Sequence, residues 1–195
     1  MEQKKIINNV FYLTLLRVFN YSLPLLLIPY LINILSPELY GHIILAQTLS
    51  LIFIVIVNFG FPLSATRAIA IHRDNKKKVT EIFSSVMIIR FLLLFFSFSI
   101  YILVVLLSDK YSAFSQIYLI TFGAVIGQTL FPVWYFQGFE DMKYITIINI
   151  VCKIVFTTLT FIFVTEADDF LLAPLFYSLG FISAGIISLI VLRNI

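Results

Sequence analysis

The sequence contains few charged residues and almost no cysteine. Only 12% of its 195 residues are charged, whereas 61% are apolar, and the mean hydropathy is +1.06. Soluble domains carry about 25% charged residues, and a water-soluble fold of this size could not bury so much apolar surface. The single cysteine, Cys152, excludes a disulfide within the chain. This composition predicts a protein embedded in lipid.

Long apolar runs, separated by short polar breaks, divide the chain into six segments. A helix needs about 20 apolar residues to cross the ~30 Å hydrocarbon core of a bilayer, and each segment reaches that length. The predicted spans are residues 10–35, 40–63, 82–107, 114–136, 144–164 and 171–192. We therefore predict an all-α, polytopic membrane protein with one six-helix domain over residues 1–195, in which the basic stretch 67–81 separates the second and third spans.

Lysine and arginine are distributed unevenly between the two sides of this predicted topology. With the N-terminus in the cytoplasm, the outside loops contain only Lys110. The inside segments contain Lys4, Lys5, Arg67, Arg73, Lys76, Lys77, Lys78, Lys143 and Arg193. Because cytoplasmic segments of membrane proteins are enriched in basic residues, the sequence predicts that both termini are cytoplasmic.

Three further cations, Arg17, Arg90 and Lys153, lie inside the first, third and fifth spans. These spans run in the same direction, which places all three cations at a depth of roughly 11–14 Å. None of the 10 acidic residues lies inside a span. A cation in this position costs about 2.5–3.5 kcal/mol unless water or a partner solvates it. Snorkelling of each side chain toward the membrane surface is the alternative.

Polar side chains accompany these cations along the helix faces. Asn20 shares a face with Arg17, and Asn149 shares one with Lys153. Polar stripes in membrane helices face a bundle interior or a watery cavity. We interpret them as one cationic cavity suited to an anion such as a phosphate group, whose oxygens arginine binds in pairs. The predicted lining residues are Arg17, Asn20, Gln47, Asn58, Arg90, Asn149 and Lys153.

Small residues and prolines predict where helices pack closely or break. Gly123 and Gly127 form a G-x-x-x-G pair, which permits close helix contact. Pro132 is expected to kink the fourth span, and Pro62 to end the second. The sequence has no nucleophile–base constellation, phosphate-binding glycine loop or paired carboxylates. We predict no enzymatic activity, no metal, no cofactor and no nucleic-acid partner.

Three stretches resemble the Wzx-type flippases of O-antigen and other bacterial polysaccharides. Residues 58–67 read NFGFPLSATR, and residues 134–142 read WYFQGFEDM. Residues 38–41 read ELYG and are followed by Gln47. The first two are similar to the family patterns GF-x-LSATR and W-x-FQG-x-E-x-M. The motif positions are Gly41, Gly60, Arg67, Trp134, Gln137, Gly138 and Glu140.

The resemblance implies a transporter of the bacterial inner membrane that serves lipopolysaccharide biosynthesis. Such proteins move an undecaprenyl-pyrophosphate-linked oligosaccharide from the cytoplasmic to the periplasmic leaflet by alternating access. Their partners would be this lipid-linked substrate, membrane lipid and polysaccharide assembly enzymes. Members of the superfamily have two six-helix lobes, whereas this sequence ends three residues after the sixth span. We expect a truncated or partial product, and the alternative is pairing of two copies.

Two other functions remain open at this point. A multidrug exporter of the same superfamily would handle cationic compounds and would be expected to contain buried acids, which these spans lack. A membrane scaffold that holds glycan-assembly enzymes without transporting anything would also suit an isolated lobe. A flipping assay on the purified chain separates the scaffold from the transporter.

Overall fold

The computed structural model describes residues 2–193, with side chains from residue 7 onward, so the side chains of Lys4 and Lys5 lie outside the described residues. No strand is assigned within residues 2–193, which confirms the predicted all-α fold. The helices are α1 (Glu2–Asn58), α2 (Phe61–His72), α3 (Lys76–Leu107), α4 (Asp109–Ser112), α5 (Ser115–Thr121), α6 (Gly123–Leu130), α7 (Val133–Gly138), α8 (Met142–Phe163), the 3-10 helix η1 (Ala167–Leu171) and α9 (Leu172–Arg193).

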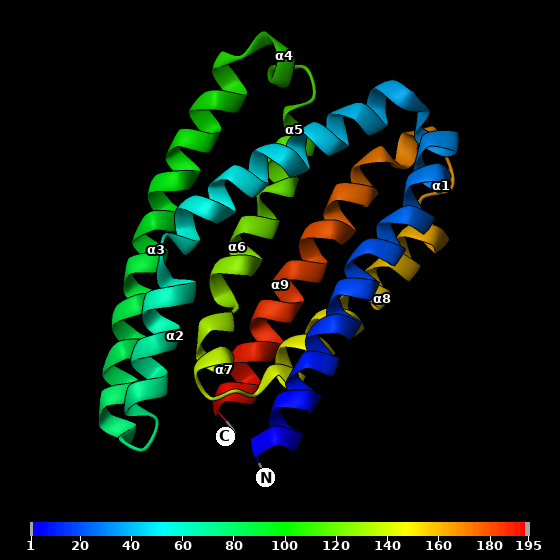
Figure 1. Cartoon of the computed structure of the whole chain (residues 1–195). Coiled ribbons are helices and arrows are strands. Elements are labelled where there is room, and N and C mark those ends of the chain that lie inside the picture. The colour runs from blue at the N-terminus through cyan, green and yellow to red at the C-terminus, as the bar shows by residue number, and fades with distance from the viewer. Residues whose placement is uncertain (1, 194–195) are drawn as a thin grey trace.

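Helix α1 contains the first two spans. Its 57 residues would measure about 85 Å if straight, far more than a bilayer requires. At Ser36, however, the backbone leaves helical geometry with φ 73° and ψ 154°, because the following Pro37 disfavours a helical residue before it. The chain turns back at this point, as Figure 1 shows. Within residues 2–193, five helical segments are long and apolar enough to cross a membrane. The turn at Ser36 divides the first of them in two, which gives six crossings.

The boundary between the second and third spans differs from the prediction. Helix α1 ends at Asn58, and α2 continues to His72 within the stretch predicted to be a break. Pro62 lies in the first turn of α2, where its missing N–H costs no helical hydrogen bond. Asn75 caps α3 by accepting a bond from the Lys78 backbone at 3.2 Å. Within the predicted break, residues 67–81, only residues 73–75 are non-helical, and a second interruption lies at residues 59–60 between α1 and α2.

The fourth span is broken where the sequence predicts a kink. Helix α6 ends at Leu130 and α7 begins at Val133, on either side of Phe131 and Pro132. Proline has no backbone N–H and its ring clashes with the preceding turn, and here Phe131 leaves helical geometry with φ −90° and ψ 103°. The prediction for Pro132 is confirmed.

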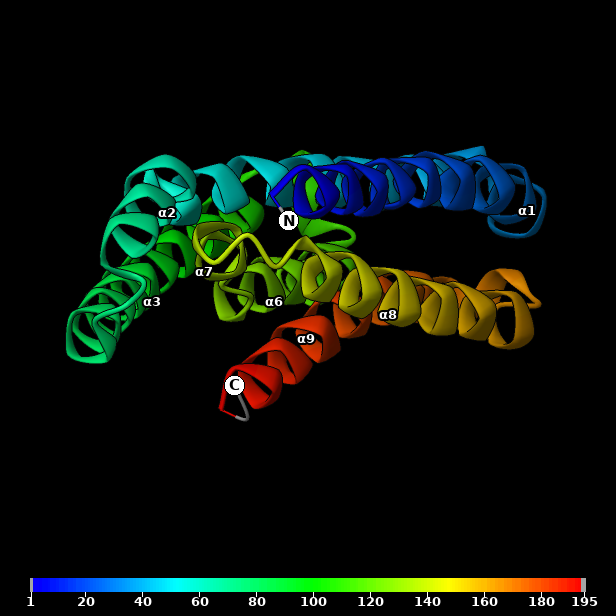
Figure 2. The ribbon, with the colours of Figure 1, turned by 60° about the horizontal axis from the view of Figure 1, so that its bottom comes forward.

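The helices form one bundle. Helix α9 packs on α6 and α8, and α8 packs on α1. Figure 2 shows α1 on one side of α8 and α6, with α9 on the other side. Both termini lie at the same end of the molecule in Figure 1, together with the α2–α3 and α7–α8 turns. This arrangement follows from an even number of crossings.

Close contact between α6 and α9 uses Gly127, one of the predicted pair, and Gly185, which the sequence pattern did not single out. A Cβ atom added at Gly127 would lie 2.5 Å from the backbone nitrogen of Ile182, and one added at Gly185 would lie 2.7 Å from the Gly127 carbonyl oxygen. The two backbones approach this closely because neither glycine has a side chain. Gly180, in contrast, faces Phe156 of α8 at ordinary contact distance, 3.6 Å.

Candidate functional site

A cavity of about 320 Å³ lies among the two halves of α1, α8 and α9. Its walls are largely aliphatic and aromatic, with a small polar set. The polar lining residues are Asn20, Gln47, Asn149, Lys153, Thr157 and Thr160. A mostly apolar cavity with a few convergent polar groups is typical of ligand sites, whose volumes run from about 300 to 1,000 Å³. This cavity lies at the small end of that range.

Lys153 supplies the charge of this cavity. Its Nζ atom donates to Asn20 Oδ1 at 2.6 Å, which joins α8 to the first span. The same atom lies 5.7 Å from the centre of the Phe181 ring on α9. No aspartate or glutamate is among the described residues that line the cavity. A neutral amide does not cancel the charge of an ammonium group, so the cavity retains a cation that an anion can bind.

Arg90 lies outside this cavity, buried among helices. Its side chain is 1% exposed. Nη2 donates to the Gln128 carbonyl at 2.6 Å and to Asn58 Oδ1 at 3.0 Å. Nη1 donates to the Phe131 carbonyl at 3.3 Å. Arg90 is therefore hydrogen-bonded to Asn58 and to the C-terminal end of α6.

Arg17 is in a third environment. It is exposed on the first half of α1 and does not line the cavity. The structure therefore does not bring the three predicted cations into one cavity: Lys153 lines it with Asn20, Gln47 and Asn149, whereas Arg17, Arg90 and Asn58 do not. The prediction that Arg17, Arg90 and Lys153 line one cavity is therefore wrong for Arg17 and Arg90. Helix-face patterns show which side of a helix is polar, but they do not show which helix that side meets.

The two longest motif stretches, although far apart in sequence, pack against each other through α2 and α7. Thr66 Oγ1 lies 3.2 Å from the Trp134 carbonyl, to which it donates, and 3.4 Å from Gln137 Oε1. A Cβ atom at Gly138 would lie 2.5 Å from Ile69 Cγ2. Sequence reasoning missed this contact, and only the presence of a family motif in both segments could have indicated it.

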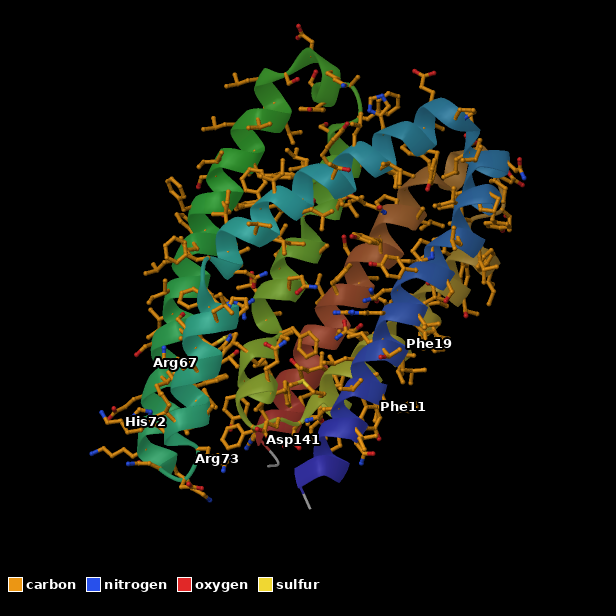
Figure 3. The ribbon with its side chains drawn as sticks, in the orientation of Figure 1. Phe11, Phe19, Arg67, His72, Arg73 and Asp141 are labelled. Atoms are coloured by element: carbon orange, nitrogen blue, oxygen red, sulfur yellow. The ribbon has the colours of Figure 1, made fainter. Side chains whose placement is uncertain are left out.

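The remaining motif positions have different surroundings. Trp134 is 2% exposed and stacks near Phe83 of α3, with ring centres 5.8 Å apart. Gly41 and Gly60 have no atom within 4 Å of an added Cβ, so packing does not explain these glycines. Glu140 has a positive φ of 60° in the α7–α8 turn. Figure 3 shows Arg67, His72 and Arg73 toward the end of the molecule that holds both termini.

Comparison with known proteins gives the family. The family model described as "Polysaccharide biosynthesis protein" matches residues 6–195. A protein named "Putative O-antigen transporter" from Escherichia coli (strain K12) is 37% identical over 181 residues, covering 93% of this chain and 44% of that protein. A protein of the same name from Shigella dysenteriae is 31% identical over 186 residues, covering 95% of this chain and 46% of that protein.

The chain thus spans less than half the length of these relatives. No solved structure matches it. The family match covers both motif stretches and all six spans, and it agrees with the resemblance found from the sequence motifs. The chain belongs to the polysaccharide biosynthesis protein family.

Proposed function

We propose that this chain is part of a transporter that flips undecaprenyl-pyrophosphate-linked O-antigen or polysaccharide repeat units. The cargo would move from the cytoplasmic to the periplasmic leaflet of the bacterial inner membrane by alternating access. The family match and the two relatives named as O-antigen transporters support this function. A transporter of this kind performs no covalent chemistry, so we propose that the chain is not an enzyme.

The chain would form one lobe of a two-lobe transporter. The relatives are more than twice as long as the segment they share with this chain, which leaves length for a second lobe. A second copy of this chain would be the alternative partner. Alternating access in repeat-built transporters arises when one bundle rocks against another. Sequencing the DNA beyond the Ile195 codon decides between the two.

The distribution of basic residues supports cytoplasmic termini. Arg67 and Arg73 lie toward the same end of the molecule as both termini (Figure 3), and Lys76, Lys77 and Lys78 begin α3 there. This end would face the cytoplasm, because basic residues near the ends of spans determine orientation. Lipid-linked cargo and assembly enzymes would then approach the transporter from this side.

The observation that carries the proposal is Lys153, the single cation among the described residues that line the cavity. Lys153 contacts a neutral amide, and no described carboxylate lines the space around it. Such a site suits an anion and disfavours the cationic compounds that a multidrug exporter would handle. At about 320 Å³ the cavity is small, so it would hold the pyrophosphate region while the glycan occupies space between the lobes. Arg17, exposed at membrane depth, would face that water-filled space because facing lipid is costly.

The experiment is complementation of a bacterial strain that lacks its own O-antigen flippase. The chain is expressed with any coding sequence that follows Ile195, and surface O-antigen is measured alongside the amount of protein in the membrane. Lys153→Met should reduce surface O-antigen at least tenfold, because a charge-assisted hydrogen bond contributes about 1.5–3 kcal/mol. Lys153→Arg should retain part of the activity.

Lys143→Met is the matched control, because it removes the same group from an exposed position at the start of the same helix. It should support wild-type levels of surface O-antigen. Equal activity of the two methionine variants, at equal amounts in the membrane, would refute the proposed role of the cavity. No surface O-antigen from the wild-type protein would refute transport itself.

A further inference from the structure

Two membrane helices of this protein are broken, and the segments that continue them carry the family motifs. Helix α1 ends at Asn58, and the chain continues after a short interruption as α2. In the same way α6 ends at Leu130, and the chain continues as α7. Phe59, between α1 and α2, has a positive φ of 41°, and Pro132 separates α6 from α7. Each break leaves carbonyl oxygens of the last helical turn without partners from their own helix.

The break at Pro132 deprives the Gln128 carbonyl of its regular helical donor. It keeps only a long bond from the Phe131 N–H at 3.3 Å, which that N–H shares with the Gly127 carbonyl. In an uninterrupted helix the N–H of residue 132 would donate to the carbonyl of Gln128, but proline has no N–H. Arg90 replaces this donor, because its Nη2 atom lies 2.6 Å from the Gln128 carbonyl oxygen. Its Nη1 atom donates to the carbonyl of Phe131 at 3.3 Å. The arginine therefore caps α6 from a different helix.

The same guanidinium group also reaches the other break. Nη2 lies 3.0 Å from the side-chain oxygen of Asn58, the last residue of α1. The C-terminal ends of helices carry partial negative charge, which attracts a cation. The predicted spans contain no carboxylate that could pair with Arg90. Its guanidinium group is instead hydrogen-bonded to neutral oxygen atoms at the ends of two helices. Because all three contacts come from one planar group, the two breaks are held at fixed positions relative to each other.

Beyond the breaks, α2 and α7 are joined a second time. Thr66 of α2 contacts the Trp134 carbonyl and Gln137 of α7, and Gly138 lies against Ile69. Helices α2 and α7 are therefore connected near their N-terminal ends by Arg90 and along their length by these contacts. We propose that Arg90 is a positioning residue that joins the two helix breaks, so that α2 and α7 keep one orientation as a unit, and that it is not an anion ligand.

Hydrogen–deuterium exchange of the full protein in lipid nanodiscs tests this proposal without relying on transport. Two backbone regions are compared, residues 55–72 across the first break and residues 125–139 across the second. Arg90→Met should accelerate exchange at least tenfold in both regions, since it removes all three contacts. Acceleration in only one region, or in neither, would overturn the proposal.

The variant Pro132→Ala provides a readout that a general loss of stability would not give. Alanine restores the N–H that can bond the Gln128 carbonyl, so α6 no longer needs Arg90. In the Pro132→Ala background, Arg90→Met should accelerate exchange in residues 55–72 and leave residues 125–139 close to their rate in Pro132→Ala alone. Equal acceleration of residues 125–139 in both backgrounds would contradict the capping role of Arg90.

Two further variants complete the test. Ser97→Ala is the control, because Ser97 is buried on the same helix and its hydroxyl has no hydrogen-bond partner within residues 7–193. It should leave exchange in both regions unchanged. Arg90→Lys keeps the charge but loses the planar fork, and it remains informative if Arg90→Met does not reach the membrane. It should give a smaller acceleration in both regions, and wild-type exchange in Arg90→Lys would overturn the proposal.

Discussion

Substitution of Gly127 by alanine should weaken the contact between α6 and α9. The added Cβ would lie 2.5 Å from the Ile182 nitrogen and 2.5 Å from the Phe181 carbonyl oxygen, whereas ordinary contacts begin at 3.4 Å. Both obstructing atoms belong to the backbone, so no side chain can rotate away. The Phe181 carbonyl carbon lies closer still, so the two helices must separate locally by at least about 0.9 Å. A gap of that size removes a quarter to a half of the dispersion energy of the atoms concerned.

The expected loss is about 1–3 kcal/mol, the usual cost of adding volume to a close-packed interface. This corresponds to an increase of roughly 5- to 150-fold in the unfolding equilibrium constant. The free energy of unfolding can be measured by titration with SDS in bicelles, followed by tryptophan fluorescence. Trp134 is the single tryptophan of the chain and is 2% exposed, so its emission reports loss of the native environment.

The control for this experiment is Gly41→Ala. An added Cβ at Gly41 meets no atom within 4 Å, and alanine favours a helix by about 1 kcal/mol relative to glycine. Gly41→Ala should therefore be neutral or stabilising. If Gly127→Ala is no more destabilising than Gly41→Ala, the close approach of α6 and α9 described here is wrong.

Three further predictions use the same unfolding measurement. Gly138→Ala should destabilise by about 1–3 kcal/mol because its Cβ would press on Ile69 Cγ2. The same substitution should cost less in an Ile69→Ala background, which lacks Cγ2, and an equal cost in both backgrounds would contradict the α2–α7 contact. Tyr30→Phe should cost about 0.5–1.5 kcal/mol, since the Tyr30 hydroxyl lies 2.9 Å from the carbonyls of both Phe161 and Val164 at the end of α8 and its one proton is shared between them. No loss would show that this cap contributes nothing. Ser36→Gly should stabilise by about 1 kcal/mol because glycine adopts φ 73° and ψ 154° without strain, and a destabilised variant would contradict strain at this turn.

The fold could largely be predicted from the sequence because hydropathy is a local signal. Each apolar run is long enough to require a helix in lipid. Pro132 marks a position where its helix can break, although α1 continues through Pro24 and Pro29. The stretch 67–81 was harder to predict, because low hydropathy indicates that a segment leaves the membrane but not that it stops being helical. Helix α2 continues through the apolar residues 68–71 to His72, and α3 is already helical from the basic residue Lys76 onward.

The cavity could be predicted in part. The polar faces that contain Asn20, Gln47, Asn149 and Lys153 do converge, because such faces are costly in lipid and turn inward. Arg90 could not be assigned in this way. Its acceptors are two backbone carbonyls and one amide on other helices, and a sequence does not show that a broken helix end will lie beside a given side chain.

The proposed transport function depends on the cation of Lys153 binding an anionic, lipid-linked cargo. The most direct measurement is the rate of flipping of an undecaprenyl-pyrophosphate-linked repeat unit in proteoliposomes that contain the purified transporter. We expect Lys153→Met to lower this rate by roughly 10- to 150-fold, which corresponds to about 1.5–3 kcal/mol for a lost charge-assisted hydrogen bond, and Lys153→Arg to restore part of it. A Lys153→Met transporter that flips the cargo at the wild-type rate would contradict the account.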